Sequence, residues 1–205
     1  IRREKSMVIE QLPNIQQTNN WVALSPLQTE YHEQYLKGVS RIIRKKHIAP
    51  FELDNAQKLL LLMRMVSDST YLIDKETNDS PKLDMLKEIL LEKMDIQNFN
   101  KKIIIFSEWV AVHKLIGRML REINVGFVEL NGKIPVKMRG ELIRKFEKND
   151  QYKVFLSTEA GGTGLNLQVA DIIINFELPW NPAKKNQRIG RIDRIGQKSQ
   201  KLNIY

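Results

Sequence analysis

The sequence has no cysteine, which excludes disulfide bonds and zinc sites with cysteine ligands. Its three histidines, His32, His47 and His113, are too widely separated to predict a metal cluster, and each fits a surface or helix-packing position. No hydrophobic run approaches the roughly 18 residues of a membrane span. The longest run, residues 59–63, is far shorter. These absences argue against a disulfide-stabilised domain, a metal site and a membrane partner.

Two signatures of nucleotide-binding proteins are also missing. The chain contains no Gly-x-x-x-x-Gly-Lys-Ser/Thr segment, which would cradle phosphates, and no adjacent Asp-Glu pair, which would hold magnesium. It therefore offers no evident site of its own for Mg²⁺ or for the β- and γ-phosphates of a nucleoside triphosphate. The chain opens at Ile1 without a methionine or a signal-peptide pattern, and we expect it to be part of a longer protein.

Positive charge is what the sequence has in excess. The 205 residues carry a net charge of +9 and a pI near 9.6, whereas the hydrophobic and charged fractions, 42% and 28%, are ordinary for a folded protein. This excess indicates a polyanionic partner, such as nucleic acid or nucleotide phosphate. Residues 184–201 concentrate the charge, because they contain seven basic side chains and one acid.

Within this basic segment, residues 187–197 read QRIGRIDRIGQ and are interpreted as helical. On a helix, Gln187, Arg191 and Arg194 would share one face, and Ile189 and Ile192 would point toward the protein beneath. Two arginines one turn apart present planar guanidinium groups that suit phosphate oxygens. A solvated basic helix explains the same run of charge, so the spacing alone leaves both interpretations open.

The first hundred residues have mainly helical patterns. A short strand is predicted within residues 15–24. Ser25 and Gln28 form a capping box that starts a helix over 26–46. A second helix over 54–67 is apolar nearly all round, so we expect it to be buried between other elements. A loop over 68–80 precedes a third helix that starts at Ser80.

From residue 101 onward, short apolar strands alternate with helices. Strands are predicted at 103–106, 127–130, 153–157, 171–176 and 202–205, with helices to about residue 123, over 136–148 and in the basic segment. This alternation predicts right-handed crossovers and a doubly wound α/β layer with a mainly parallel sheet. Ligands of such sheets bind at the carboxyl ends of the strands, so the residues that follow each strand are the candidates for function.

Polar or aromatic side chains follow four of these strands. Ser107 can cap the next helix, either for stability alone or to leave amides for an anion. Asn131 and Lys133 form a turn that is either plain or a basic tip. Thr158 lies in a glycine-rich loop, residues 157–167, whose amides suit a phosphate, although a structural turn also uses glycine. Trp180 lies in a rigid turn, where composition favours a buried anchor over an exposed indole.

These residues carry a resemblance to a known family. The segment FLSTEAGGTGLNLQVADIIINFELPWNPAKKNQRIGRIDRIGQ resembles motifs five and six in the second RecA-like lobe of superfamily-two helicases, specifically the SWI/SNF-type DNA translocases. KIIIFSEW resembles motif four, and VELNG with Arg139 and Phe146 resembles the element that follows it. RREK at residues 2–5, with Leu12 and Pro13, is similar to the junction between the two lobes. The QRIGR form and the short 68–80 loop resemble the compact prokaryotic branch and depart from the nucleosome remodellers.

The resemblance implies a fold and a set of site residues. Residues 101–205 would form a RecA-like three-layer α/β/α lobe, and residues 1–100 would form the interlobe junction and an α-helical protrusion. The residues implied to act in catalysis are Arg191 and Arg194, as arginine fingers on the γ-phosphate of ATP, and Gln187, which would orient them or join the nucleotide network. The residues implied at the ATP and lobe interface are Gly162, Gly164 and Asn166. Those implied along the DNA backbone are Ser107, Trp109, Asn131, Lys133, Thr158 and Trp180.

The implied function is that of the second ATPase lobe of an ATP-dependent double-stranded DNA translocase or remodeller. ATP and Mg²⁺ would be bound mainly by the N-terminal ATPase lobe of the same chain, so this lobe alone would be inactive. Its partners would be double-stranded DNA and that lobe, with a protein target left open, in the cytoplasm or nucleoid of a prokaryote or the nucleus of a eukaryote. The alternatives are a lobe of a strand-separating helicase and a catalytically inert lobe that binds DNA or protein.

Overall fold

The computed structural model describes residues 12–98, 100–159 and 165–205, and the chain forms two compact units. The first unit, called the lobe here, contains Leu90–Tyr205 together with the segment that precedes Trp21. The second unit, Trp21–Ile89, is helical.

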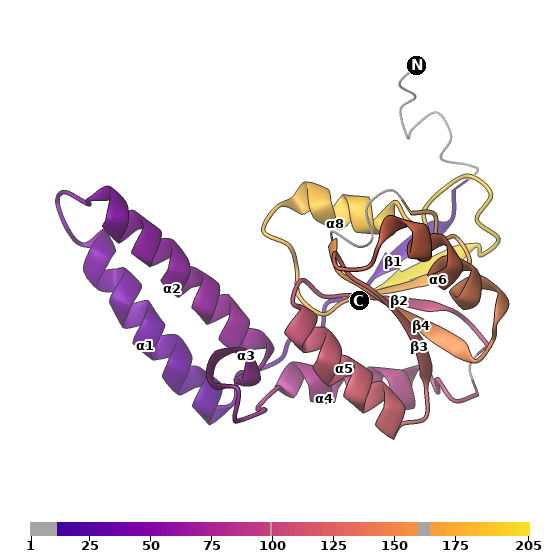
Figure 1. Ribbon diagram of the computed structural model, residues 1–205, viewed down its shortest axis with the longest axis horizontal. Helices are drawn as coiled ribbons and strands as arrows, with labels where there is room; N and C mark the ends of the chain where they lie inside the picture. The colour runs from indigo at the N-terminus through magenta and orange to yellow at the C-terminus, as the bar shows by residue number, and fades with distance from the viewer. Residues whose placement is uncertain (1–11, 99, 160–164) are drawn as a thin grey trace, which may run out of the picture. The chain divides into compact units, whose positions relative to one another are not determined.

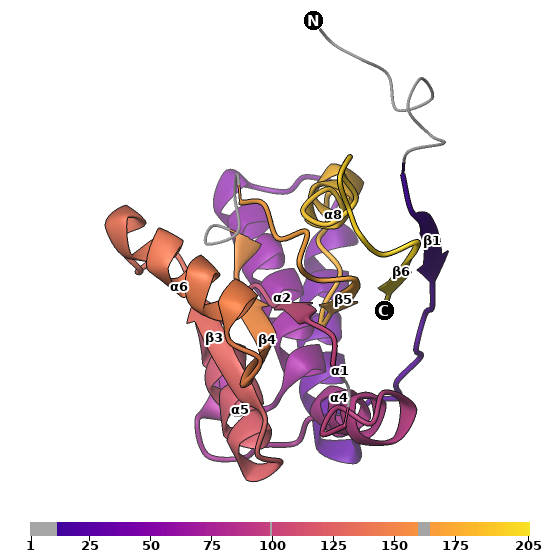
Figure 2. The ribbon, with the colours of Figure 1, turned by 90° about the vertical axis from the view of Figure 1, so that its right-hand side faces the viewer.

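The lobe is built on a parallel sheet with the strand order β1-β6-β5-β2-β4-β3 (Figure 2). All five pairings between neighbouring strands are parallel. The strands are β1 Asn14–Gln17, β2 Ile103–Phe106, β3 Gly126–Leu130, β4 Tyr152–Ser157, β5 Ile172–Asn175 and β6 Lys201–Ile204. The five strands predicted after residue 100 are confirmed, each within one residue at either end.

The first predicted strand is shorter than expected. β1 ends at Gln17, and its last ladder hydrogen bond is donated by Thr18 N–H to the Ile204 carbonyl at 2.8 Å. The extension to Leu24 is wrong, because Trp21 belongs to the helical unit and its side chain is 91% exposed. The apolar residues Trp21, Val22 and Leu24 suggest a strand, but they lie where the chain has already left the sheet.

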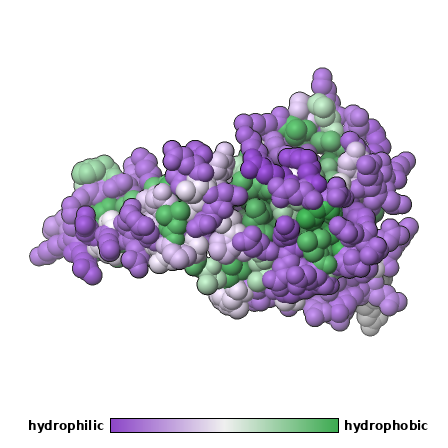
Figure 3. Space-filling view, turned by 90° about the horizontal axis from the view of Figure 1, so that it is seen from below, coloured by the Kyte–Doolittle hydropathy of each residue, from purple (hydrophilic) through white to green (hydrophobic). Residues whose placement is uncertain are grey.

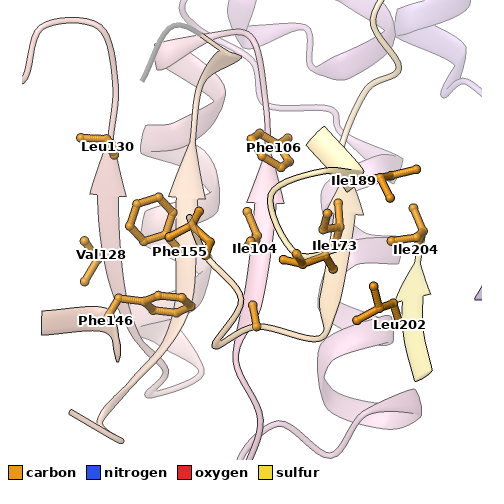
Figure 4. Packing of buried hydrophobic residues seen from close by; sticks show 13 residues of the cluster. Ile104, Phe106, Val128, Leu130, Phe146, Phe155, Ile173, Ile189, Leu202 and Ile204 are labelled. Atoms are coloured by element: carbon orange, nitrogen blue, oxygen red, sulfur yellow. The ribbon is translucent and has the colours of Figure 1, made fainter. Parts of the chain in front are cut away.

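Helices cover both faces of the sheet. Helix α6 (Val136–Lys148) and helix α8 (Pro182–Ile189) lie on one side and helix α5 (Val110–Glu122) on the other (Figure 1). The core on the α6 and α8 side contains Ile104, Phe106, Phe155, Ile173 and Phe146 among other buried side chains (Figure 4). The side chains of a strand alternate between the two faces, so a strand covered on both sides must be apolar throughout, as β2 is. The predicted three-layer α/β/α arrangement is confirmed.

The strand register brings the carboxyl ends of the central strands into line. Phe106 at the end of β2 is opposite Ser157 of β4 and Asn175 of β5. Leu130 at the end of β3 is also opposite Ser157. The residues that follow these four strands therefore lie along one edge of the sheet, where ligands of parallel α/β sheets bind.

The helical unit contains α1 (Pro26–Ile43), α2 (Pro50–Asp68), α3 (Tyr71–Asp74) and α4 (Pro81–Glu88), which continues into the π-helical turn η2 (Ile89–Lys93). The capping box of α1 is confirmed, because Ser25 Oγ accepts from Gln28 N–H at 3.2 Å and Gln28 Oε1 accepts from Ser25 N–H at 3.1 Å. Ser80 caps α4 in the same way through Leu83 N–H. The segment expected to be a loop, residues 68–80, contains the short helix α3.

The prediction that α2 is buried between other elements is wrong. Its Leu60 and Leu61 side chains are 40% and 43% exposed, and its buried residues are Ala56, Val66 and Asp68. The physical reason is that α2 pairs with α1 as a helical hairpin, which covers only one side of α2 (Figure 1). Hydrophobic side chains therefore reach the surface of this unit, as the green areas at the left of Figure 3 show. No helix in the part of the chain that the structure describes is long and apolar enough to cross a membrane.

Candidate functional site

The segments that follow the central strands are held together at the carboxyl edge of the sheet. Ser107 N–H donates to the Ser157 carbonyl at 3.1 Å, and Thr158 N–H donates to the Leu130 carbonyl at 3.1 Å. Phe176 N–H donates to the Phe106 carbonyl at 3.0 Å. These bonds extend the ladders by one residue, so the loops begin from a rigid base.

A groove opens at this edge of the sheet. It has a volume of about 480 Å³ and is lined by two lysines, two glutamates and three uncharged residues: Lys133, Lys184, Glu108, Glu159, Val110, Gly132 and Thr158. The structure thus brings together Lys133 and Thr158, two of the residues predicted to contact DNA. Lys184 was not among the predicted site residues, and its only sequence signal was its membership of the basic segment.

A chain of hydrogen bonds fixes the turn that carries Lys133. The buried His113 ring faces the Ser107 carbonyl through Nε2 at 3.1 Å and Glu129 Oε1 through Nδ1 at 3.2 Å. Asn131 Nδ2 donates to the same Glu129 oxygen at 2.9 Å, and Asn131 Oδ1 accepts from Lys133 N–H at 3.0 Å. Two predicted site residues, Ser107 and Asn131, are therefore connected through His113, to which the sequence analysis gave no role.

The hydrogen bond from His113 lowers the pKa of the Glu129 carboxyl, and the Asn131 bond adds to this effect against the opposing effect of burial. A carboxyl whose pKa is lower in the folded state stabilises the fold above its unfolded pKa of about 4.3. That contribution is lost as the pH falls through the folded pKa.

We therefore expect Glu129→Gln to destabilise the chain most at neutral pH, with a difference from wild type that shrinks as the pH falls from about 5 to about 3. Urea unfolding midpoints across this range measure the effect. Glu122→Gln, at the exposed end of α5, is the matched control and should show no such trend. A difference between Glu129→Gln and wild type that is independent of pH would contradict the prediction.

Two other predicted DNA contacts need correction. Ser107 does not cap α5, whose N-cap is Trp109 without a side-chain cap bond. The reason is that Ser107 remains an extension of β2, with a fully buried side chain, and two further residues precede the helix. Trp180 is 73% exposed, so the buried anchor that composition favours is wrong for this indole. Trp109 is half-buried.

The basic segment is not one continuous helix. Helix α8 ends at Ile189, with Gly190 as its C-cap, and residues 190–197 form successive turns. Gly196 has a φ of +92°, a value that favours glycine and stops a helix. The prediction that Gln187, Arg191 and Arg194 share a helix face is therefore wrong in its geometry. The predicted burial of Ile189 and Ile192 beneath this segment is confirmed.

The turns that carry Arg191 and Arg194 are bonded to the chain after the glycine-rich loop. Leu167 N–H donates to the Arg191 carbonyl at 3.1 Å, and Gln168 Nε2 donates to the Arg194 carbonyl at 3.2 Å. Gln197 Nε2 donates to the Ala170 carbonyl at 3.1 Å. Residues 167–170 and 191–197, which belong to the stretches that resemble motifs five and six, are therefore held together by hydrogen bonds.

The guanidinium groups of Arg191 and Arg194 lie close enough to affect each other. Burial lowers the pKa of Arg191 from its ordinary value, the positive charge of Arg194 lowers it further, and Glu159 opposes both effects. Arg194 Nε donates to the Gly190 carbonyl at 2.6 Å, which folds this side chain back toward its own turn. Two mutually repelling cations are suited to an anion with several oxygens, such as a phosphate.

The remaining predicted site residues are more peripheral or lie outside the described residues. Gln187 is exposed on the last turn of α8. Asn166 is exposed and donates through Nδ2 to Gln168 Oε1 at 2.9 Å. Gly162 and Gly164 lie outside the residues that the structure describes, as does the RREK segment at 2–5.

Arg188 is the residue that the sequence reasoning missed. It was counted with the surface cations of the basic segment, but its side chain is 1% exposed. Nε donates to Glu159 Oε2 at 2.9 Å, and Nη1 donates to Asn175 Oδ1 and the Glu177 carbonyl, each at 3.0 Å. The sequence signal that could have indicated its burial is the presence of Glu159 after β4 and Glu177 after β5, because a buried cation needs partners of this kind.

The basic side chains of this site suit phosphate. Arg191, Arg194 and the two lysines of the groove supply positive charge and hydrogen-bond donors, while the carboxylates of Glu108 and Glu159 line the same groove. Among residues 12–98, 100–159 and 165–205, no group of three His, Cys, Asp or Glu side chains is placed to hold a metal ion.

Residues 81–196 match the family described as the helicase conserved C-terminal domain. The chain belongs to this family. It is 32% identical over 200 residues to an "uncharacterized ATP-dependent helicase" of Mycoplasma pneumoniae, a match that covers 97% of this chain and 19% of that protein. The chain spans about a fifth of the length of the first curated relatives that it matches, 19% and 20%.

Two similar solved structures identify which type of helicase C-terminal lobe this chain is. The SWI2/SNF2 ATPase core of Sulfolobus solfataricus in complex with dsDNA is 28% identical, with a TM-score of 0.77 over 100% of this chain and 44% of that one. The separate C-terminal domain of a SWI2/SNF2 ATPase from the same organism is 26% identical, with a TM-score of 0.73 over 93% of this chain and 78% of that one. This chain is therefore a C-terminal RecA-like lobe of the SWI/SNF type.

Proposed function

We propose that this lobe supplies arginine fingers and part of the DNA-backbone track to an ATP-dependent double-stranded DNA translocase. The observation that carries the proposal is that Glu159, which lines the groove together with Lys133 and Thr158, also acts electrostatically on Arg191, the neighbour of Arg194. Within the proposal, residues 101–205 are the lobe proper and residues 1–100 are the junction and protrusion. ATP and Mg²⁺ are bound mainly by the N-terminal ATPase lobe.

In the catalytic step, Arg191 and Arg194 donate hydrogen bonds to the γ-phosphate oxygens when the two lobes close, and Gln187, which is exposed on α8, joins the network around the nucleotide. ATP, when bound, supplies the terminal phosphoryl group that passes to water. Arg191 is suited to this role because its own desolvation and the charge of Arg194 make an incoming anion favourable. Asn166, with Gly162 and Gly164, brings the glycine-rich loop to the lobe interface. Hydrolysis then weakens closure, and the lobes step along one strand.

The DNA track consists of the side chains that follow the strand ends. Lys133 contacts the phosphate backbone. Thr158, Asn131 and Ser107 are buried and support the track from beneath, the last two by holding the turn through His113 and Glu129. Trp109 and the exposed Trp180 flank the track. The Sulfolobus relative in complex with dsDNA, similar over the whole of this chain, supports duplex DNA as the partner.

Backbone-directed binding predicts a steep dependence on salt. In the full-length protein, the logarithm of DNA affinity should fall by roughly 0.9 per log unit of salt for each phosphate neutralised, with little dependence on sequence. Lys133→Gln with Lys184→Gln should lower this slope by about 1 to 2. Fluorescence anisotropy with duplexes of unrelated sequence measures it, and Arg118→Gln on the exposed side of α5 is the control for lost positive charge. Binding that is insensitive to salt, or specific for one duplex, would count against the proposed track.

Two alternatives remain testable with the full-length protein. A strand-separating helicase of the same superfamily would release a labelled strand from a partial duplex during ATP hydrolysis, whereas a duplex translocase would displace a triplex-forming strand instead. An inert binding lobe would bind DNA without hydrolysis. The paired Arg191 and Arg194 favour an ATPase, because binding to a phosphate backbone does not require two arginines in this arrangement.

A further inference from the structure

Arg188 occupies an unusual place among the cations of the basic segment. Its guanidinium is buried, lies 5.1 Å from the centre of the Phe106 ring, and is held by the Asn175 side chain and the Glu177 carbonyl. Glu159 is its charged partner, at 2.9 Å. A buried guanidinium that bonds to strand-end groups on three sides is fixed in position, unlike a surface cation.

Arg188 and Arg191 leave the same turn of the chain. Arg191 N–H donates to the Arg188 carbonyl at 3.0 Å, which places the two side chains side by side at the end of α8. Glu159, at the end of β4, bonds to Arg188, and its charge also acts on Arg191. One carboxylate is therefore within range of two arginines, and only one of those arginines is proposed to contact ATP.

The position of Glu159 decides how much charge remains for an incoming phosphate. While Glu159 is bonded to Arg188, Arg191 and Arg194 keep two positive charges at the site. If Glu159 moved to Arg191, it would form an ion pair there and compete with the γ-phosphate for the same guanidinium donors. The buried Arg188 favours the first arrangement, because an ion pair away from water is stronger than a pair with a half-exposed partner.

We propose that Arg188 is a positioning residue that holds Glu159 and thereby keeps Arg191 available for the nucleotide. The inference rests on the proposed function, in which Arg191 contacts the γ-phosphate. It adds that Glu159 is an intrinsic competitor for this finger, restrained by its buried neighbour. The role of Arg188 is therefore distinct from that of the two arginines that follow it.

The test uses the full-length protein with saturating DNA. Arg188→Gln should release Glu159 to Arg191 and lower kcat about tenfold or more, which corresponds to about 1.4 kcal/mol of barrier. Arg188→Met should behave in the same way. Adding Glu159→Gln to Arg188→Gln removes the competitor and should restore kcat to within a few-fold of wild type. Glu159→Gln alone should keep kcat within a few-fold of wild type.

The thermal unfolding temperature of every variant is measured first. The ATPase assay is then run well below the lowest of these temperatures, so that kcat is measured on folded protein. If Glu159→Gln alone lowered kcat as much as Arg188→Gln, and the double variant were no better, Glu159 would support Arg191 rather than compete with it and the inference would be overturned. If the double variant recovered thermal stability but not kcat, Arg188 would act on catalysis by a route other than restraining Glu159, which also overturns the inference. A failure of the proposed function would be recognised by a different variant. If Arg191→Lys hydrolysed ATP at the wild-type rate, Arg191 would not contact the γ-phosphate as proposed.

Discussion

Replacing Arg194 by alanine in the full-length protein should abolish DNA-stimulated ATP hydrolysis while most duplex binding remains. An arginine finger stabilises charge that develops on the transferred phosphoryl group, so its loss appears in turnover rather than in DNA affinity. Such fingers contribute about 10³ to 10⁵ in rate, which corresponds to roughly 4 to 7 kcal/mol of barrier. Phosphate release and DNA anisotropy on the same preparation measure the two quantities. Lys198→Ala, four residues away and exposed, is the matched control for lost charge.

Arg191→Lys is the sharper variant of the pair. It keeps the positive charge but loses the planar fork that bonds two phosphate oxygens, so a mere electrostatic patch would tolerate it and a finger would not. If Arg191→Lys hydrolysed ATP normally, and Arg194→Ala lost DNA binding in proportion to its activity, these turns would be a phosphate-backbone contact. The finger assignment would then be wrong.

The second large effect concerns the chain of residues 1–205 by itself. We expect it to show no ATPase activity above background, because its described residues gather no metal-binding cluster and its sequence lacks the phosphate-cradling and Asp-Glu signatures. Arginine fingers alone provide neither the magnesium ion nor a site for the β-phosphate. Activity should appear only when the N-terminal ATPase lobe is present.

Steady phosphate release by the purified chain is the measurement for this second prediction. Contaminating ATPases are excluded by preparing Arg194→Ala in parallel, since a contaminant would give equal rates in both preparations. Phosphate release by the wild-type chain that disappears in Arg194→Ala would show that this chain hydrolyses ATP unaided, and would contradict the assignment of the nucleotide site to the other lobe.

Most of the lobe could be predicted from local sequence patterns, for physical reasons. A run such as Ile103–Phe106 has few other stable environments than a strand covered on both faces, and the capping box at Ser25 specifies a helix start through its own hydrogen bonds. The helical unit was harder to predict. The apolar surface of α2 was read as burial, whereas a two-helix hairpin leaves much of that surface exposed.

The site was predictable in its membership but not in its geometry. The resemblance to motifs five and six was enough to select Arg191 and Arg194 as site residues. The single helix predicted to align their side chains, however, ends at Ile189. Contacts between distant residues were invisible in the sequence. Examples are the bond from Arg188 to Glu159 and the link from His113 to Glu129. Such contacts depend on strand order and register, which no local pattern encodes.

The pairing of β1 with β6 has a mechanical consequence for any force applied along the chain. The two strands are parallel and in register from Asn14 opposite Lys201 to Gln17 opposite Ile204. A pull on the chain before Asn14 and an opposing pull after Ile204 therefore slide the strands past each other instead of peeling them apart. The bonds from Asn14 N–H to the Gln200 carbonyl at 2.9 Å and from Thr18 N–H to the Ile204 carbonyl at 2.8 Å share that load with the rest of the ladder. Force transmitted along the chain through this edge of the sheet would thus be resisted in shear by all of its hydrogen bonds at once.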